Sequence, residues 1–175
     1  LYDLEVTCLK ATGGNNRRNR LRDCQLCLIT TPCPDLIDRV TAALRSGVAM
    51  VQHRCKSGSD RERLAEARTL AALCRDHGAL LIINDRIDLA LAVDADGVHL
   101  GQDDLPTDVA RGLIGPDRLL GRSTHDLDQV AQTNREDCDY MGLGPVNTTA
   151  VKPERPAIGA DLVLSLIHIS EPTRQ

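Results

Sequence analysis

Short apolar runs alternate with stretches of helical apolar spacing from Cys24 onward, and this alternation limits the possible folds more than any other feature. The runs span residues 26–30, 50–53, 80–84, 97–100, 119–123 and 140–142. They are continuously apolar, as expected of strands buried on both faces of a parallel sheet. Repeated strand–helix alternation builds right-handed βαβ units. The pattern predicts an α/β protein with six such units, either a doubly wound sheet or a barrel.

The clearest helix signal spans residues 59–77. Its apolar residues recur at helical spacing on one face, at Leu64, Ala67, Ala71 and Cys74. Ser59 and Glu62 have the spacing of a capping box, and Gly78 stands where a helix is expected to stop.

The core must be built almost without aromatic rings, because the 175 residues include two Tyr, no Phe and no Trp. The same lack argues against a stacking surface for single-stranded nucleic acid. A net charge of −4 offers no general attraction to nucleic acid or anionic membranes. No apolar run approaches the roughly 20 residues that span a bilayer. We therefore expect one domain whose partners are small molecules, and the sequence leaves a homo-oligomer open.

Residues 1–23 lack the alternating pattern. They contain Gly13-Gly14-Asn15-Asn16 followed by four arginines, and they predict a flexible basic leader to which no fold is assigned. Such arginines can grip phosphate or RNA, but a solvated linker is the favoured interpretation.

The seven cysteines are scattered, which does not fit a disulfide framework. Cys24-x-x-Cys27 has the spacing of half a zinc site, but no second pair or His follows at metal spacing. We expect reduced thiols and a cytoplasmic location.

Polar side chains cluster after each of the last five apolar runs. The clusters are Gln52, Arg54 and Lys56; Asn84, Asp85 and Arg86; Gln102, Asp103 and Asp104; Ser123, Thr124 and His125; and Thr148, Thr149 and Lys152. A barrel gathers the carboxyl ends of its strands at one mouth, whereas a doubly wound sheet spreads them along an edge. The clusters therefore favour a TIM (β/α)8 barrel, of which about six of the eight β/α units are present.

The residue types in these clusters indicate a ligand. Arg54, Lys56 and Lys152 supply cationic donors, and Gln52, Asn84, Ser123 and Thr149 supply neutral ones. Asp85 and Asp104 are hard oxygen donors on neighbouring strands, which suits Mg²⁺ bound partly through a diphosphate.

Plainer interpretations stay open for several of these residues. Asp88, Asp94 and Asp96 fit helix caps and turns. His53, His99 and His125 are either acid–base groups or packing residues, and Cys55 is either a ligand contact or a spacer that faces away.

At these residues the sequence resembles the thiamine-phosphate synthase family. The matching stretches are residues 51–56, 82–90, 95–106, 121–125 and 142–146, of which 95–106 is the longest and most specific. The resemblance runs from about Cys24 to Val163 in matching order and spacing. It implies a transferase of thiamine biosynthesis that couples hydroxymethylpyrimidine diphosphate to hydroxyethylthiazole phosphate and releases diphosphate.

The resemblance also implies the roles of individual residues. The implied substrate contacts are Gln52, His53, Arg54, Cys55, Lys56, Asn84, Ser123, Thr149 and Lys152, with Thr149 on the thiazole phosphate. Asp85 and Asp104 would bind Mg²⁺, and no residue is assigned as a general acid or base.

The sequence departs from the family pattern at three positions. Asn147 and Val151 replace an aromatic residue and a Thr, and Cys55 replaces a common Glu. Val151 removes a hydroxyl from the thiazole-phosphate site. The alternatives are a thiazole tautomerase-like relative, which typically lacks the metal carboxylates, and a catalytically dead ligand-binding barrel.

The chain is predicted to hold three parts: the leader 1–23, a truncated barrel over 24–163, and a foreign tail over 164–175. The tail begins Leu164-Ser165-Leu166-Ile167-His168 and reads like the in-frame translation of a transposase sequencing adapter. A barrel that lacks two strands leaves edges unpaired and its interior open, so we expect this chain to be unstable and inactive.

Overall fold

The computed structural model describes residues 6–9, 16–147 and 157–159, and of residues 6–9 it describes the backbone. Six strands lie parallel in chain order, as the apolar runs predict. They are β2 (Cys27–Ile29), β3 (Met50–His53), β4 (Leu80–Asn84), β5 (Gly97–Leu100), β6 (Leu119–Thr124) and β7 (Tyr140–Leu143). The sheet order is β1-β7-β6-β5-β4-β3-β2, with β1 (Val6–Leu9) antiparallel to β7.

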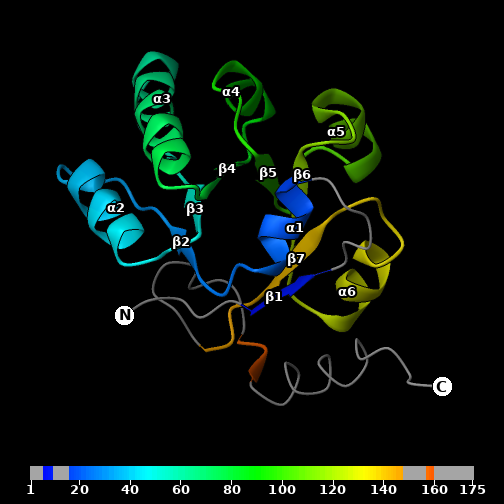
Figure 1. Cartoon of the computed structure of the whole chain (residues 1–175). Helices are drawn as coiled ribbons and strands as arrows, with labels where there is room; N and C mark the ends of the chain where they lie inside the picture. Colours follow the sequence, from blue (N-terminus) through cyan, green and yellow to red (C-terminus); the bar gives the residue numbers. More distant parts are fainter. Residues whose placement is uncertain (1–5, 10–15, 148–156, 160–175) are drawn as a thin grey trace.

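Helices follow the parallel strands and cover the convex side of the curved sheet (Figure 1). They are α2 (Leu36–Arg45), α3 (Asp60–Asp76), α4 (Ile87–Ala92), α5 (Thr107–Ile114) and α6 (Leu127–Thr133). The arrangement is a half-barrel, which confirms the incomplete TIM barrel predicted from the sequence. No helix in the described ranges is long and apolar enough to cross a membrane.

The two larger apolar clusters occupy the two faces of the sheet. The larger one joins outward side chains such as Val51, Leu81 and Val98 to the surrounding helices. The smaller one fills the concave side with Met50, Ile82, Tyr140 and their neighbours. Because side chains alternate along a strand, the parity of a residue decides whether it reaches the barrel interior.

Helix α3 begins and ends at the predicted residues. The Ser59 hydroxyl accepts from Glu62 N, and the Glu62 carboxylate accepts from Ser59 N, so the capping box is formed. At the other end Gly78 has a φ of 68°, the left-handed conformation in which glycine commonly ends a helix.

The expectation of a leader without fold is wrong for the described part of residues 1–23. Helix α1 (Asn16–Arg22) lies across the centre of the arc of strands (Figure 1), and Leu21 is buried among the interior apolar residues. Its arginines bind groups at the amino ends of the strands. Arg17 Nε donates to Asp96 Oδ1 at 3.1 Å, and Arg20 Nη2 donates to Gly78 O at 2.9 Å.

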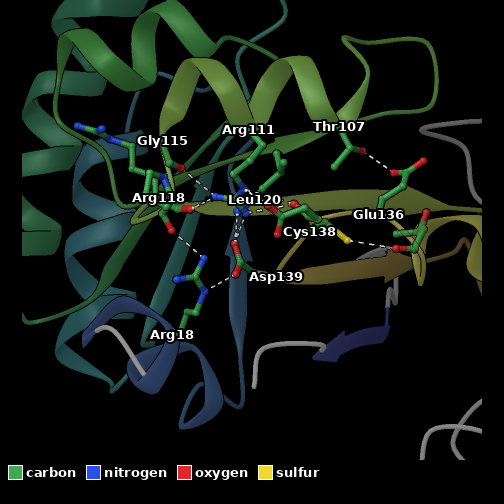
Figure 2. Close-up of polar contacts among 12 residues, drawn as sticks. Arg18, Thr107, Arg111, Gly115, Arg118, Leu120, Glu136, Cys138 and Asp139 are labelled. Carbon is green, nitrogen blue, oxygen red and sulfur yellow. Dashed lines mark hydrogen bonds and ion pairs between the residues drawn. The ribbon is translucent and has the colours of Figure 1, made fainter. Parts of the chain in front are cut away.

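A buried carboxylate, Asp139, ties α1 to the sheet at this amino end. It accepts from Arg18 Nε at 2.6 Å, from Arg111 Nη2 at 2.8 Å and from Leu120 N at 2.8 Å (Figure 2). Side-chain pairs three or four residues apart on a helix can be predicted from sequence, but the partners of Asp139 include Arg18, which is distant along the chain. Tertiary ion pairs therefore organise a segment whose local pattern indicates a linker.

Candidate functional site

Polar side chains predicted from the sequence meet at the carboxyl ends of β3 to β6. Gln52 is buried and has the parity of Met50, so it faces the barrel interior. Asn84 ends β4 beside His99 of β5 in the sheet register. Ser123 of β6 lies 2.9 Å from His99, measured between Oγ and Nε2.

Two carboxylates approach each other at this end. Asp85 and Asp104 follow neighbouring strands, and their carboxyl groups lie near enough for the charge of Asp104 to act on Asp85. Burial raises the pKa of the Asp85 carboxyl above its ordinary value, and the negative charge of Asp104 raises it further. Asp85 also has a φ of 64°, a left-handed conformation that costs energy for a residue other than glycine. The fold thus holds a strained residue and two like charges at one point.

Cationic side chains lie beside the acidic pair. Lys56 Nζ is 3.9 Å from Asp85 Oδ2, and its side chain is 63% exposed. Arg54 is half-buried, and its charge, like that of Lys56, lowers the pKa of Asp85. Positive and negative side chains therefore lie together at the carboxyl ends of β3 and β4.

Two residues predicted as substrate contacts, His53 and Cys55, have other partners in the structure. His53 has the opposite parity to Gln52 and is buried against α3, with Nε2 3.4 Å from Glu66 Oε1. Burial lowers the pKa of the His53 imidazole. The Cys55 thiol instead donates to Ser57 O at 3.1 Å. We leave both side chains out of the proposed site, because strand alternation turns His53 outward and Cys55 bonds within its own loop.

Two further predicted residues, Thr149 and Lys152, lie outside the described residues. Their roles stay predictions.

His99 is the interior residue whose role the sequence left undecided. It is buried, and its Nδ1 lies 3.2 Å from the Tyr140 hydroxyl while its Nε2 faces Ser123. One sequence signal for its orientation was available: His99 is two residues from Gly97, so the two residues lie on the same face of β5. Gln102, which donates from Nε2 to Ser123 O at 2.5 Å, was found by its position after the strand.

The arrangement suits a hard divalent cation with an anionic ligand. Among the described residues, no group of three His, Cys, Asp or Glu side chains forms a complete metal cage. Two carboxylates with nearby cationic groups leave coordination positions for phosphate oxygens and water, which is how Mg²⁺ usually binds. The donors present therefore fit Mg²⁺ accompanied by a phosphate ester.

These features define a class: an α/β half-barrel with an acidic pair and phosphate-type cationic groups at the carboxyl ends of its strands. A family model described as "Thiamine monophosphate synthase" matches residues 26–172, and the chain belongs to this family.

Similar proteins carry the same name. The chain is 90% identical over 170 residues to a thiamine-phosphate synthase of Parasynechococcus marenigrum (strain WH8102), covering 97% of this chain and 49% of that protein. It is 66% identical over 171 residues to the thiamine-phosphate synthase of Synechococcus sp. (strain CC9605), covering 98% of this chain and 49% of that protein. A solved thiamine phosphate pyrophosphorylase from Pyrococcus furiosus superposes with a TM-score of 0.77 at 34% identity, covering 87% of this chain and 72% of that one.

The chain spans about half the length of the curated relatives it matches. The family match runs to residue 172 and so enters the segment 164–175. The foreign origin of that segment, like the boundaries at 23 and 163, stays a prediction.

Proposed function

We propose that this chain carries a pyrimidine-diphosphate site of thiamine-phosphate synthase, a transferase that joins hydroxymethylpyrimidine diphosphate to hydroxyethylthiazole phosphate and releases diphosphate. The observation that carries the proposal is the approach of Asp85 and Asp104 beside Lys56. Like charges repel, and a divalent cation bound to diphosphate removes that repulsion. The complete reaction is proposed for the full-length family architecture, and diphosphate binding for this chain.

Mg²⁺ is the cation we propose, with Asp85 and Asp104 as its protein ligands. An all-oxygen donor set favours a hard ion over zinc or copper. When bound, Mg²⁺ would neutralise charge on the leaving diphosphate.

The remaining side chains act on the diphosphate and on the ring. Arg54 and Lys56 pair with diphosphate oxygens and stabilise the negative charge that grows as the carbon–oxygen bond breaks. Gln52, Asn84 and Ser123 donate neutral hydrogen bonds that orient the substrate. The departing diphosphate leaves a pyrimidine-stabilised cation, which the thiazole nitrogen captures, so this step needs no general base.

Thr149 and Lys152 complete the proposal as contacts to the thiazole phosphate and the pyrimidine diphosphate. A cytoplasmic location is also proposed, supported by the six cysteines within residues 16–147, none of which forms a disulfide.

The test is calorimetric titration of the chain with hydroxymethylpyrimidine diphosphate, with and without Mg²⁺. We expect binding that requires Mg²⁺ and weakens by at least about 10-fold in Asp85→Asn and in Asp104→Asn. Asp103→Asn is the matched control, because Asp103 is exposed in the same loop. Binding without Mg²⁺, or equal binding by all three variants, would contradict the proposal and favour the tautomerase-like alternative.

Diphosphate release on mixing both substrates with the full-length protein separates an enzyme from a ligand-binding barrel. Release that requires both substrates supports the synthase, and binding without release supports the dead barrel.

A further inference from the structure

The loop that carries Asp104 is short and is held at both ends by one buried side chain. Arg122 of β6 is 5% exposed and points to the helix-covered side of the sheet, where its backbone pairs with Leu100. Its Nη1 donates to Gly101 O at 2.9 Å and to Leu105 O at 3.2 Å. These two carbonyls are the first and last of the loop 101–105, so a single guanidinium fixes the span of the loop.

A hydrogen bond within the loop fixes the Asp104 carboxylate. Gly101 N donates to Asp104 Oδ2 at 2.6 Å, so the residue held by Arg122 in turn holds the carboxylate. A side chain at position 101 would crowd this contact, since a Cβ there would lie 3.1 Å from Asp104 Oδ2. The chain of contacts from Arg122 to the carboxylate therefore has one intermediate residue.

Arg122 also has an acidic partner, Glu136, in the segment that follows α6. Its Nε lies 3.8 Å from Glu136 Oε2, and the same carboxylate oxygen accepts from the Thr107 hydroxyl at the start of α5, a contact drawn in Figure 2. Gln132 Nε2 donates to the other oxygen, Oε1, at 3.0 Å. Arg122, Glu136 and Thr107, here called the Arg122 clamp, thus join β6, the segment after α6 and the start of α5.

The Arg122 clamp would counteract the repulsion between Asp85 and Asp104. Asp85 and Asp104 repel, and a loop free to move would separate them. Asp85 is fixed by the end of β4, where its amide donates to His99 O at 2.9 Å. Asp104 sits on the loop 101–105, whose first and last carbonyls accept from Arg122. Resting on the proposed Mg²⁺ site, we propose that Arg122 is a positioning residue that holds Asp104 against Asp85 and so preorganises the cation site.

The structure offers a matched control for a purely structural role. Arg111 is also largely buried, and its Nη1 likewise bridges two carbonyls, Gly115 O at 3.1 Å and Arg118 O at 2.7 Å (Figure 2). It does so at the amino end of the strands, away from Asp104. The lysine ammonium ends one bond short of the arginine Nη1 that makes the bridge, so both substitutions weaken the bridge and keep the charge.

The test is a titration of the chain with Mn²⁺, used as a spectroscopic substitute for Mg²⁺, together with amide hydrogen exchange at Gly101. We expect Arg122→Lys to weaken Mn²⁺ binding by roughly 10- to 100-fold and to speed exchange at the Gly101 amide. Arg111→Lys should lower the melting temperature but leave the Mn²⁺ affinity within about twofold of wild type, because its bridge does not reach the loop.

Glu136→Gln gives a second measure of the clamp. The variant leaves the Arg122 side chain intact but removes the negative charge of its ion-pair partner. We therefore expect a loss of Mn²⁺ affinity that is smaller than in Arg122→Lys. This variant decides the matter if Arg122→Lys does not fold.

The outcomes separate the two proposals. A wild-type chain that binds no Mn²⁺ overturns the proposed cation site and this inference together. A wild-type chain that binds Mn²⁺ while Arg122→Lys and Glu136→Gln bind it equally well overturns the clamp alone. Equal losses in Arg111→Lys and Arg122→Lys also overturn it, because they would assign both effects to general destabilisation.

Discussion

The amino and carboxyl ends of the six parallel strands both carry buried or half-buried carboxylates, and they partner them in opposite ways. At the amino end, Asp139 receives hydrogen bonds from two arginines and a backbone amide (Figure 2). At the carboxyl end, Asp85 faces a second carboxylate, Asp104, and its cationic neighbour Lys56 is largely exposed.

This contrast shows which end of the strands stabilises the fold and which end is suited to bind a ligand. Charges that are paired and hydrogen-bonded within the protein stabilise it without a ligand. Charges of one sign that converge cost stability until a counter-ion arrives, and such perturbed groups concentrate at functional sites. Barrels commonly divide these tasks between their two ends.

The largest effect is expected from Asp139→Ala. Asp139 is a carboxylate that is 5% exposed, and its removal takes away the buried ion-pair partner of both Arg18 and Arg111, which costs about 3–5 kcal/mol of unfolding free energy. Urea unfolding measures it. Asp137→Ala is the control, since Asp137 pairs with the same Arg111 but is 76% exposed, and it should change stability little. Equal losses in the two variants would break the distinction between buried and exposed pairs.

A smaller loss is expected in the layer of side chains between the two ends. Gly121→Ala would place a Cβ against the ring of Tyr140 and against His99, and overpacking of this kind costs about 1–3 kcal/mol. Gly112→Ala has open space around it on α5 and should stabilise the chain by about 0.5–1 kcal/mol. Thermal unfolding of both variants gives opposite signs if the interior is packed as described.

Lys56→Ala tests the role of the carboxyl end in ligand binding. Lys56 is exposed, so its loss should leave the unfolding free energy nearly unchanged while weakening the binding of Mg²⁺-diphosphate by roughly tenfold. Arg18→Ala should behave inversely, with lower stability and unchanged binding, because Arg18 lies at the amino end. Isothermal titration and urea unfolding of the two variants test the pair, and a shared phenotype would contradict the division between ends.

The smallest effect concerns pH. The pKa of Asp85 is raised in the folded chain, so between its ordinary and its raised value the folded state binds more protons than the unfolded state. Stability must then fall as the pH rises through that window. Asp85→Asn removes this slope, and the difference between wild type and variant isolates the carboxyl because the other titrating groups are common to both. Unfolding curves from about pH 4 to about pH 8 without Mg²⁺ measure it, and identical slopes would show that Asp85 is not perturbed.

The strand positions could be predicted because burial on both faces leaves continuous apolar runs. The predicted runs at 50–53, 80–84 and 97–100 coincide with β3, β4 and β5. The approach of Asp85 to Asp104 also followed, since loops after neighbouring strands meet at one end of a barrel.

Other features depend on contacts that no local pattern records. Helix α1 has Leu21 as its buried residue, and its position rests on ion pairs to Asp96 and Asp139, about 80 and 120 residues away. Arg122 stands inside an apolar run, where its sequence gives no sign of the loop it holds. The outward turn of His53 could have been predicted from strand alternation, since neighbouring side chains on a strand point to opposite faces and Gln52 was expected in the site.

The most direct test of the contrast between the two ends is the unfolding free energy of wild type and Asp85→Asn at neutral pH, with and without Mg²⁺. Without Mg²⁺, the variant should be the more stable of the two, because it removes a carboxylate that Asp104 repels. Mg²⁺ at about 100 times its Kd for the wild type should stabilise the wild type by about 2.7 kcal/mol, and the variant, which binds at least about 10-fold more weakly, by at most about 1.4 kcal/mol. A variant that is less stable than wild type without Mg²⁺, as expected of Asp139→Ala, would contradict the account, and so would equal stabilisation of both proteins by Mg²⁺.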